Sequence, residues 1–240
     1  MTPPTGFVRV DGTSLVRSGY EAYLEEWASA VDSVGRASDT GRGAIARVAL
    51  PDGRAIVKHY RHGGWLGDRL GDLYWDWPPR PWRELAATEA VRAAGILAPE
   101  VLAAIVVPLG ASGPRAWLYR AELVTRELAG RRSLGSALTS AATAAERGAW
   151  LAAAARAMRR LHEAGVSHPD LSVGNFLVGP DPSEPIAIID FDRAAVGPPP
   201  VSALGRWAAR RRLARSVAKL ALPSLDRTSV AAIVRAAEVA

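Results

Sequence analysis

The residues best suited to chemistry form one short run, His168-Pro169-Asp170-Leu171-Ser172-Val173-Gly174-Asn175, and Asp190 follows 15 residues later. A carboxylate such as Asp170 can orient a hydroxyl group and accept its proton. The neutral carbonyl oxygen of Asn175 and the carboxylate of Asp190 are oxygen ligands of the kind that Mg²⁺ binds together with phosphate groups. Such a set suits phosphoryl transfer, which depends on positioning and charge neutralisation more than on covalent catalysis.

The spacing resembles the H-x-D-L-x-x-x-N catalytic loop and the D-F-G metal motif of the protein-kinase-like fold. The run meets the offsets of that loop, and Asp190 is followed by phenylalanine. The resemblance implies that Asp170 is catalytic, that Asn175 and Asp190 bind Mg²⁺ and that ATP is the phosphate donor. We expect His168 to hold the loop in place rather than to shuttle protons.

The composition makes the few lysine and asparagine residues informative. Of the 30 Lys+Arg residues, 28 are arginine, which leaves only Lys58 and Lys219, and Asn175 is the only asparagine. Lys58 closes a β-prone run at 55–60, as the lysine of the third kinase strand does. Its compact ammonium suits the α- and β-phosphates of ATP as a point charge. We therefore assign it to ATP binding and catalysis.

Two further segments are expected to contact ATP. Gly41, Gly43 and Val48 resemble the glycine-rich phosphate loop of kinases, since glycines let a backbone approach phosphates closely. A plain β-turn would give the same pattern. Glu127 and Leu128 fall where the hinge of the kinase fold binds adenine, mainly through backbone groups.

A glutamate on the helix expected over residues 82–94 should pair with Lys58. Glu84 and Glu89 both qualify by type, but at a spacing of five they do not share a helix face. Glu84 is closer to the helix-to-strand spacing of the kinase fold. We therefore expect Glu84 to be the partner of Lys58 and Glu89 to lie on a solvated face.

The order of elements predicts an α+β fold. Two β-prone runs at 44–50 and 55–60, joined by Pro51-Asp52-Gly53-Arg54, predict a hairpin. Further along the chain, strands are predicted at 101–109 and 116–128. Helices are then predicted at 141–163 and 201–222. Strands first and helices later indicate a single kinase-like domain with two lobes, a β-rich N-lobe over about 1–128 and a mainly helical, shortened C-lobe over about 129–240.

Chain length argues against an ordinary protein kinase. Only 48 residues follow Asp192, no A-P-E sequence follows Asp190, and Pro169 stands in place of the arginine of H-R-D. These features favour a small-molecule kinase or a minimal atypical protein kinase. A non-catalytic kinase-fold binding module is less favoured, because the lysine and the loop residues are all retained.

A closer resemblance lies in the segments 57–67 and 70–74 and in Arg83-Glu84, which look like the lipopolysaccharide kinase (Kdo/WaaP) family, where Kdo is 3-deoxy-D-manno-octulosonic acid. Residues 189–193 and 213–220 are similar to the same family. The resemblance implies phosphorylation of a sugar hydroxyl, the 4-OH of Kdo, on the lipid A-linked inner core of lipopolysaccharide. It also implies a cytoplasmic enzyme, peripheral on the inner face of the inner membrane.

The net charge of +6 is confined to the end of the chain. Residues 201–240 hold eight basic and two acidic residues, which sum to +6 and leave residues 1–200 neutral. Basic helices suit lipid A phosphates and anionic headgroups, although a solvated basic face has the same pattern. We expect acceptor or membrane contacts from Arg206, Arg210, Arg211, Arg212 and Arg215. No motif indicates nucleic-acid binding, and no obligate protein partner is inferred.

Other chemistries are excluded by composition. The chain has no cysteine, so disulfides, thiolate metal sites and cysteine nucleophiles are ruled out. No uncharged apolar run reaches the roughly 18 residues of a membrane span, and the N-terminus lacks a signal pattern. We therefore expect a soluble cytoplasmic chain. The tryptophan-rich segment 65–82 predicts either an interfacial anchor or a packed lid.

Overall fold

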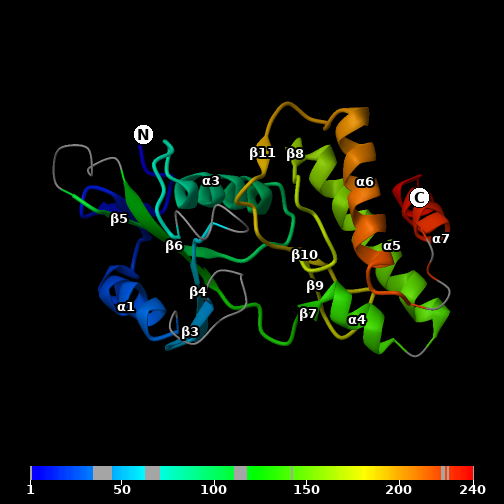
Figure 1. The fold of residues 1–240 in the computed structure, drawn as a ribbon, viewed down its shortest axis with the longest axis horizontal. Helices are drawn as coiled ribbons and strands as arrows, with labels where there is room; N and C mark the ends of the chain where they lie inside the picture. The colour runs from blue at the N-terminus through cyan, green and yellow to red at the C-terminus, as the bar shows by residue number, and fades with distance from the viewer. Residues whose placement is uncertain are drawn as a thin grey trace. The chain divides into compact units, whose positions relative to one another are not determined.

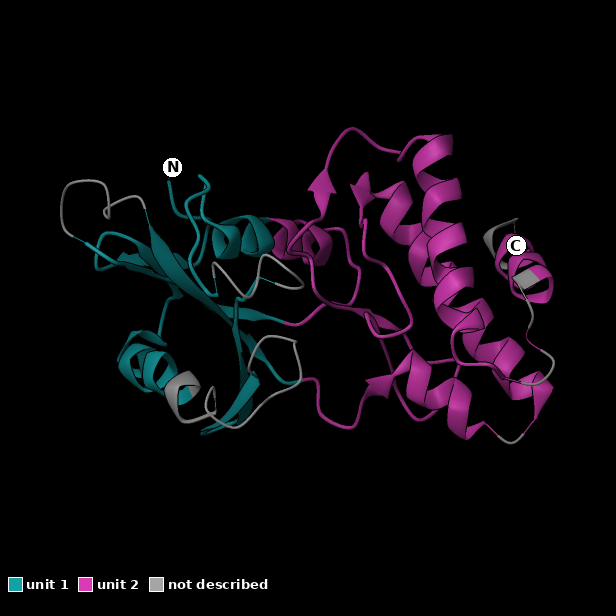
Figure 2. Ribbon diagram, viewed as in Figure 1, with its two compact units in different colours: residues 1–86, 100–127 teal, residues 87–99, 128–240 magenta. Residues whose placement is uncertain are grey.

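The computed structural model describes residues 2–34, 45–62, 71–110, 118–141, 143–222, 225 and 227–239. The chain divides into two compact units (Figure 2): unit 1 comprises 1–86 and 100–127, and unit 2 comprises 87–99 and 128–240. The lobe boundary predicted near residue 128 assigned residues 87–99 to the first lobe. In the structure these residues belong to unit 2, where Val91, Ile96 and Ala98 join the core and Ile188 donates its backbone N–H to Leu97 O at 3.0 Å.

Unit 1 is built on a six-stranded antiparallel sheet with the strand order β1-β2-β5-β6-β4-β3 (Figure 1). The strands are β1 (Phe7–Val10), β2 (Ser14–Arg17), β3 (Ile45–Leu50), β4 (Gly53–His59), β5 (Val101–Pro108) and β6 (Tyr119–Arg126). Leu50 pairs with Gly53, so Pro51 and Asp52 form the turn between β3 and β4. This confirms the predicted hairpin.

The two faces of this sheet are buried by different helices. Trp27 of α1 (Leu24–Val34) lies in the core of one face, which includes Val57 of β4. Trp82 and Leu85, from the first turns of α3 (Arg80–Ala93), lie in the core of the other face. Because side chains of a strand alternate between faces, Lys58 lies on the face opposite Val57. The N-terminal elements β1, β2, the 3₁₀ turn η1 (Glu21–Tyr23) and α1 were not predicted.

Unit 2 is mainly helical, with α4 (Leu134–Ser140), α5 (Ala144–Glu163), α6 (Ala203–Ala218) and α7 (Arg227–Val239) (Figure 1). The central helix α5 begins with a capping box, in which Thr143 and Glu146 satisfy each other's backbone N–H groups. It ends before Gly165, which adopts φ +77°. Large side chains of α5, including Trp150 and Met158, fill the core of this unit.

Short β-ribbons in unit 2 position the candidate residues. One three-stranded ribbon joins β7 (Arg132–Ser133), β9 (Phe176–Val178) and β10 (Ala187–Ile188), and a second pairs β8 (Val166–Ser167) with β11 (Ala195–Val196). The loop 168–175 runs from β8 to β9, and the segment 189–194 runs from β10 to β11. Both segments are therefore fixed at each end by a strand. In the described parts of the chain, no helix is long and apolar enough to cross a membrane.

Candidate active site

In unit 1, Lys58 forms an ion pair with Glu84. Its Nζ lies 3.2 Å from Oε1 and 3.1 Å from Oε2 of a carboxylate that is only 3% exposed. The hydroxyl of Tyr60 donates to the same carboxylate, and Lys58 Nζ lies 4.9 Å from the centroid of the Tyr60 ring. Glu89 instead lies 3.8 Å from Arg92 on its own helix. The prediction that Glu84, and not Glu89, pairs with Lys58 is confirmed.

The structure corrects the assignment of Val48 to the ATP-binding face. In the β3–β4 register Val48 pairs with Ala55, whereas Lys58 pairs with Ile45. Val48 is buried in the core under α1, on the face opposite Lys58. A one-residue difference reverses the face of a strand residue. Ile45, Arg47 and Ala49 therefore share the face of Lys58, and Ile45, which is 53% exposed, lies directly opposite Lys58. Gly41 and Gly43 lie outside the described residues.

Glu127, the last residue of unit 1, contacts two arginines through its carboxylate and forms a hydrogen bond through its backbone N–H. Its carboxylate accepts from Arg47 Nε at 3.0 Å and lies 2.7 Å from Arg54 Nε, while its backbone N–H donates to Arg54 O at 2.8 Å. The hydrogen bond from Arg47, together with Arg54, lowers the pKa of this carboxyl. Its N–H is therefore already paired within the sheet. Leu128, the other predicted adenine contact, is the next residue and belongs to unit 2.

In unit 2, Asn175 ties the two candidate segments together. Its side-chain Nδ2 donates to the backbone oxygen of Asp170 at 2.9 Å, and its own backbone oxygen accepts the N–H of Ile189 at 3.0 Å. Ile189 precedes Asp190, so the two proposed metal ligands lie on segments that are joined by a backbone hydrogen bond. Because the amide nitrogen is committed to Asp170, the amide oxygen is the atom left to bind a cation.

His168 holds the same two segments together. Its ring is buried, its Nε2 lies 3.2 Å from the backbone oxygen of Ile189, and it packs against Phe191 with ring centroids 5.3 Å apart. Burial lowers its pKa, so the ring is neutral near pH 7 and Nε2–H donates to the carbonyl. This geometry agrees with the expected structural role of His168.

Asp190 adopts a backbone conformation that is rare for a residue with a side chain. Its φ is +68°, in the left-handed region. Such a conformation persists only where the surrounding structure holds the backbone in place. Among the described residues, no group of three or more His, Cys, Asp or Glu side chains could hold a metal by itself. The side-chain oxygens of Asn175 and Asp190 are of the kind that Mg²⁺ binds together with phosphate oxygens and water.

Two arginines face the carboxylate of Asp170. Arg212 Nη1, from α6, lies 3.4 Å from Oδ1, and Arg193 Nη1, from the segment after β10, lies 3.5 Å from Oδ2. Arg212 was expected to contact an acceptor or membrane, and the structure brings it to Asp170. Arg193 was not recognised as a site residue, although it lies in the quoted run 189–193 and its position directly after the metal motif was a usable signal.

The remaining arginines of α6 have different surroundings. Arg206 donates to Val201 O at 2.5 Å, and the guanidinium of Arg211 lies 4.6 Å above the ring of Trp207. Trp207 is 48% exposed and Leu204 is 73% exposed. Arg210 and Arg215 lie on the same helix, Arg215 in its last turn. Leu204, Trp207 and Arg211 therefore present both apolar and cationic groups of α6 to solvent.

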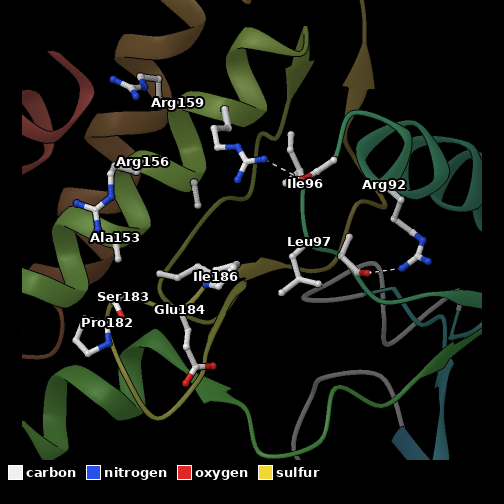
Figure 3. Close-up of a pocket in the computed structure, with 15 residues that line it drawn as sticks. Arg92, Ile96, Leu97, Ala153, Arg156, Arg159, Pro182, Ser183, Glu184 and Ile186 are labelled. Atoms are coloured by element: carbon white, nitrogen blue, oxygen red, sulfur yellow. Dashed lines mark hydrogen bonds between the residues drawn. The ribbon is translucent and has the colours of Figure 1, made fainter. Parts of the chain in front are cut away.

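A separate pocket of about 610 Å³ lies within unit 2, between α5 and the segments 95–98 and 182–186 (Figure 3). Arg92 and Arg160 hold its wall together by donating to the backbone oxygens of Ala98 (2.8 Å) and Gly95 (2.9 Å). Arg156 of α5 also lines it. The candidate residues Asp170, Asn175 and Asp190 do not line this pocket, so it is distinct from the candidate active site.

Comparison with known proteins identifies close relatives. The model of the lipopolysaccharide kinase (Kdo/WaaP) family matches residues 25–231. The 3-deoxy-D-manno-octulosonic acid kinase of Vibrio cholerae serotype O1 is 33% identical over 162 residues, which are 66% of this chain and 64% of that protein. The enzyme of the same name from Stenotrophomonas maltophilia strain R551-3 is 31% identical over 201 residues, or 82% and 73% of the two chains. The chain thus spans slightly less than two thirds of the Vibrio relative.

A solved structure described as WaaP in complex with acyl carrier protein matches with a TM-score of 0.54. The match covers 90% of this chain and 87% of that one, at 19% sequence identity. At this identity the match establishes the fold alone. The predicted protein-kinase-like α+β fold is confirmed.

Proposed function

Because this chain belongs to the lipopolysaccharide kinase (Kdo/WaaP) family, we propose that it uses ATP to phosphorylate the 4-OH of Kdo on the lipid A-linked inner core of lipopolysaccharide. The observation that carries the proposal is the hydrogen-bonded arrangement in which Asn175 joins the loop of Asp170 to the segment of Asp190. This arrangement supplies a carboxylate for the acceptor hydroxyl beside a ligand pair for Mg²⁺.

Each residue has a distinct role in the proposed reaction. Lys58, held by Glu84, binds ATP phosphates as a point charge. Asp170 orients the acceptor hydroxyl and takes its proton. The oxygens of Asn175 and Asp190 hold Mg²⁺, which neutralises charge on the phosphates when it is bound. Ile45 offers an apolar contact on the same strand face as Lys58.

The same proposal includes peripheral attachment to an anionic membrane. Leu204 and Trp207 are exposed apolar side chains, and Arg211 stacks on Trp207 beside them. Tryptophan favours the headgroup level of a bilayer, and arginine is attracted to anionic lipids. These contacts support a location on the cytoplasmic face of the inner membrane, where a lipid-linked acceptor is available.

The direct test is transfer of labelled phosphate from ATP to Kdo-linked lipid A in the presence of Mg²⁺. We expect product with the wild type and none with Asp170→Ala, whose binding of Mg·ATP should persist. Wild-type protein that binds Mg·ATP but labels no Kdo acceptor would overturn the proposed acceptor. Labelling of protein instead would favour a minimal atypical protein kinase. Absence of nucleotide binding by calorimetry would favour a non-catalytic kinase-fold module.

A further inference from the structure

The carboxylate of Asp170 is flanked by positive charge on both sides. Arg212 approaches Oδ1 from α6, and Arg193 approaches Oδ2 from the segment after β10. The separations of 3.4 and 3.5 Å exceed the roughly 2.7–2.9 Å of a tight charge-assisted hydrogen bond. Both arginines are therefore near Asp170 without being tightly bound to it.

Each guanidinium retains donors that these contacts do not use. A guanidinium carries several N–H groups in a planar fork that matches a carboxylate, and each contact with Asp170 involves only one Nη1 atom. The side chains of Arg193 and Arg212 are 69% and 37% exposed, so a solvent-borne anion can reach both. The pair is thus suited to bind a second carboxylate beside that of Asp170.

We propose that Arg193 and Arg212 bind the carboxylate of the acceptor sugar and so select an acidic sugar over a neutral one. The inference rests on the proposed function, because Kdo is a sugar acid that carries this group. The acceptor carboxylate binds the donors that Asp170 leaves unused and draws the two guanidinium groups away from Asp170. One oxygen of Asp170 is then released to accept a hydrogen bond from the acceptor hydroxyl. Recognition of the acid group and activation of the hydroxyl are therefore coupled.

The kinetic test compares a Kdo acceptor with its carboxamide analogue. For the wild type we expect the acid to be phosphorylated with a kcat/KM about 10- to 100-fold higher than the amide. Arg193→Gln and Arg212→Gln should each reduce kcat/KM for the acid, and the double variant should treat both acceptors alike. The KM for ATP should stay unchanged. Arg156→Gln, an exposed arginine of α5 that lines the separate pocket, is the matched control and should retain the wild-type preference.

A merely structural role would give a different pattern. If the arginines only positioned Asp170, the double variant would lose rate equally on both acceptors and keep the preference for the acid. That result would overturn the inference while leaving the proposed function intact. Circular dichroism and Mg·ATP binding would verify that the variants are folded.

A binding measurement separates the two proposals. Calorimetry with free Kdo and with its carboxamide reports on the carboxylate site without any turnover. Binding of the acid alone, lost in the double variant, supports the inference even if no phosphate is transferred, and in that case only the proposed function fails. If the wild type binds and phosphorylates Kdo and its carboxamide equally well, the inference about the arginines is rejected and the proposed function stands. Neither binding nor phosphorylation would reject both.

Discussion

Asn175 donates its side-chain N–H to the backbone oxygen of Asp170 at 2.9 Å. An amide can make this contact and still present an oxygen to a cation, whereas an ionised carboxylate has no hydrogen to donate. We expect Asn175→Asp to lower kcat by at least about 100-fold, because an aspartate oxygen would face the carbonyl of Asp170 instead of donating to it. Kinetics at increasing Mg²⁺ concentration would check this. Full activity of Asn175→Asp at saturating Mg²⁺ would show that the amide donor is not needed.

The ion pair of Lys58 and Glu84 predicts effects on both ATP binding and stability. Lys58→Arg should weaken ATP binding, because a planar guanidinium cannot occupy the position of a compact ammonium. Lys58→Ala should in addition destabilise the fold by about 2 kcal/mol, since it removes the cation beside the buried carboxylate of Glu84. Calorimetric ATP titration and urea unfolding measure the two effects. Glu89→Gln is the control, and a loss of ATP affinity equal to that of Glu84→Gln would contradict the pairing.

Gly165 lies at a close backbone crossing. Its φ is +77°, and an added Cβ would lie 2.3 Å from the backbone oxygen of Gly197. Gly165→Ala should therefore destabilise the protein by more than about 3 kcal/mol. A Cβ added at Gly148, inside α5, would meet open space, so Gly148→Ala should stabilise by about 0.5–1 kcal/mol. Urea unfolding of both variants would test this. Similar changes in unfolding free energy for the two substitutions would contradict the close approach of Gly165 to the backbone of Gly197.

His162 predicts a loss of stability in acid. Burial, with the nearby charges of Arg206 and Arg210, lowers its pKa to about 4 from 6.5. The unfolded chain therefore takes up a proton between these values while the folded chain does not. Stability is complete above about pH 6.5 and should fall by up to about 3 kcal/mol as the pH drops to about 4.

The readout for His162 is the difference between the unfolding free energies of the wild type and His162→Leu across this pH range. The difference isolates His162 from the other histidines. His168 acts in the same direction. His59 acts in the opposite one, because Glu122 and Asp72 outweigh burial and raise its pKa. A difference that does not change with pH would exclude a neutral buried His162.

The exposed apolar residues of α6 predict membrane binding. Leu204→Ser combined with Trp207→Ser should lower the affinity for anionic vesicles at least about 10-fold, with little change in ATP affinity. Val107→Ser removes an apolar side chain of β5 that is 46% exposed and should leave vesicle binding unchanged. Sedimentation with vesicles measures both. Equal losses in the two proteins would argue against a specific surface on α6.

The sequence was most informative where chemistry is local. Asp170, Asn175 and Asp190 are separated by short fixed spacings, and the structure connects their segments by hydrogen bonds. Glu84 followed from its resemblance to the helix-to-strand spacing of the kinase fold. The face of the sheet on which Val48 lies could not be predicted from the sequence. It depends on the pairing register of β3 with β4, and a shift of one residue moves a side chain to the opposite face.

Contacts between segments that are far apart in the chain could not be predicted from sequence patterns. Arg212 meets Asp170 across 42 residues of chain, which only the packing of α6 determines. The strands β1 and β2 have four residues each, too few for alternation to be distinctive. Residues 87–99 join unit 2 through packing with α5 and β10, although the chain before and after them lies in unit 1.

The two arginines at Asp170 should also affect the rate at which ATP is hydrolysed in the absence of acceptor. A kinase that holds ATP without its acceptor risks passing the phosphate to water. Water carries no negative charge with which to draw Arg193 or Arg212 away from the Asp170 oxygens. The unloaded enzyme should therefore hydrolyse ATP slowly, and the double arginine variant should leak phosphate to solvent faster than the wild type.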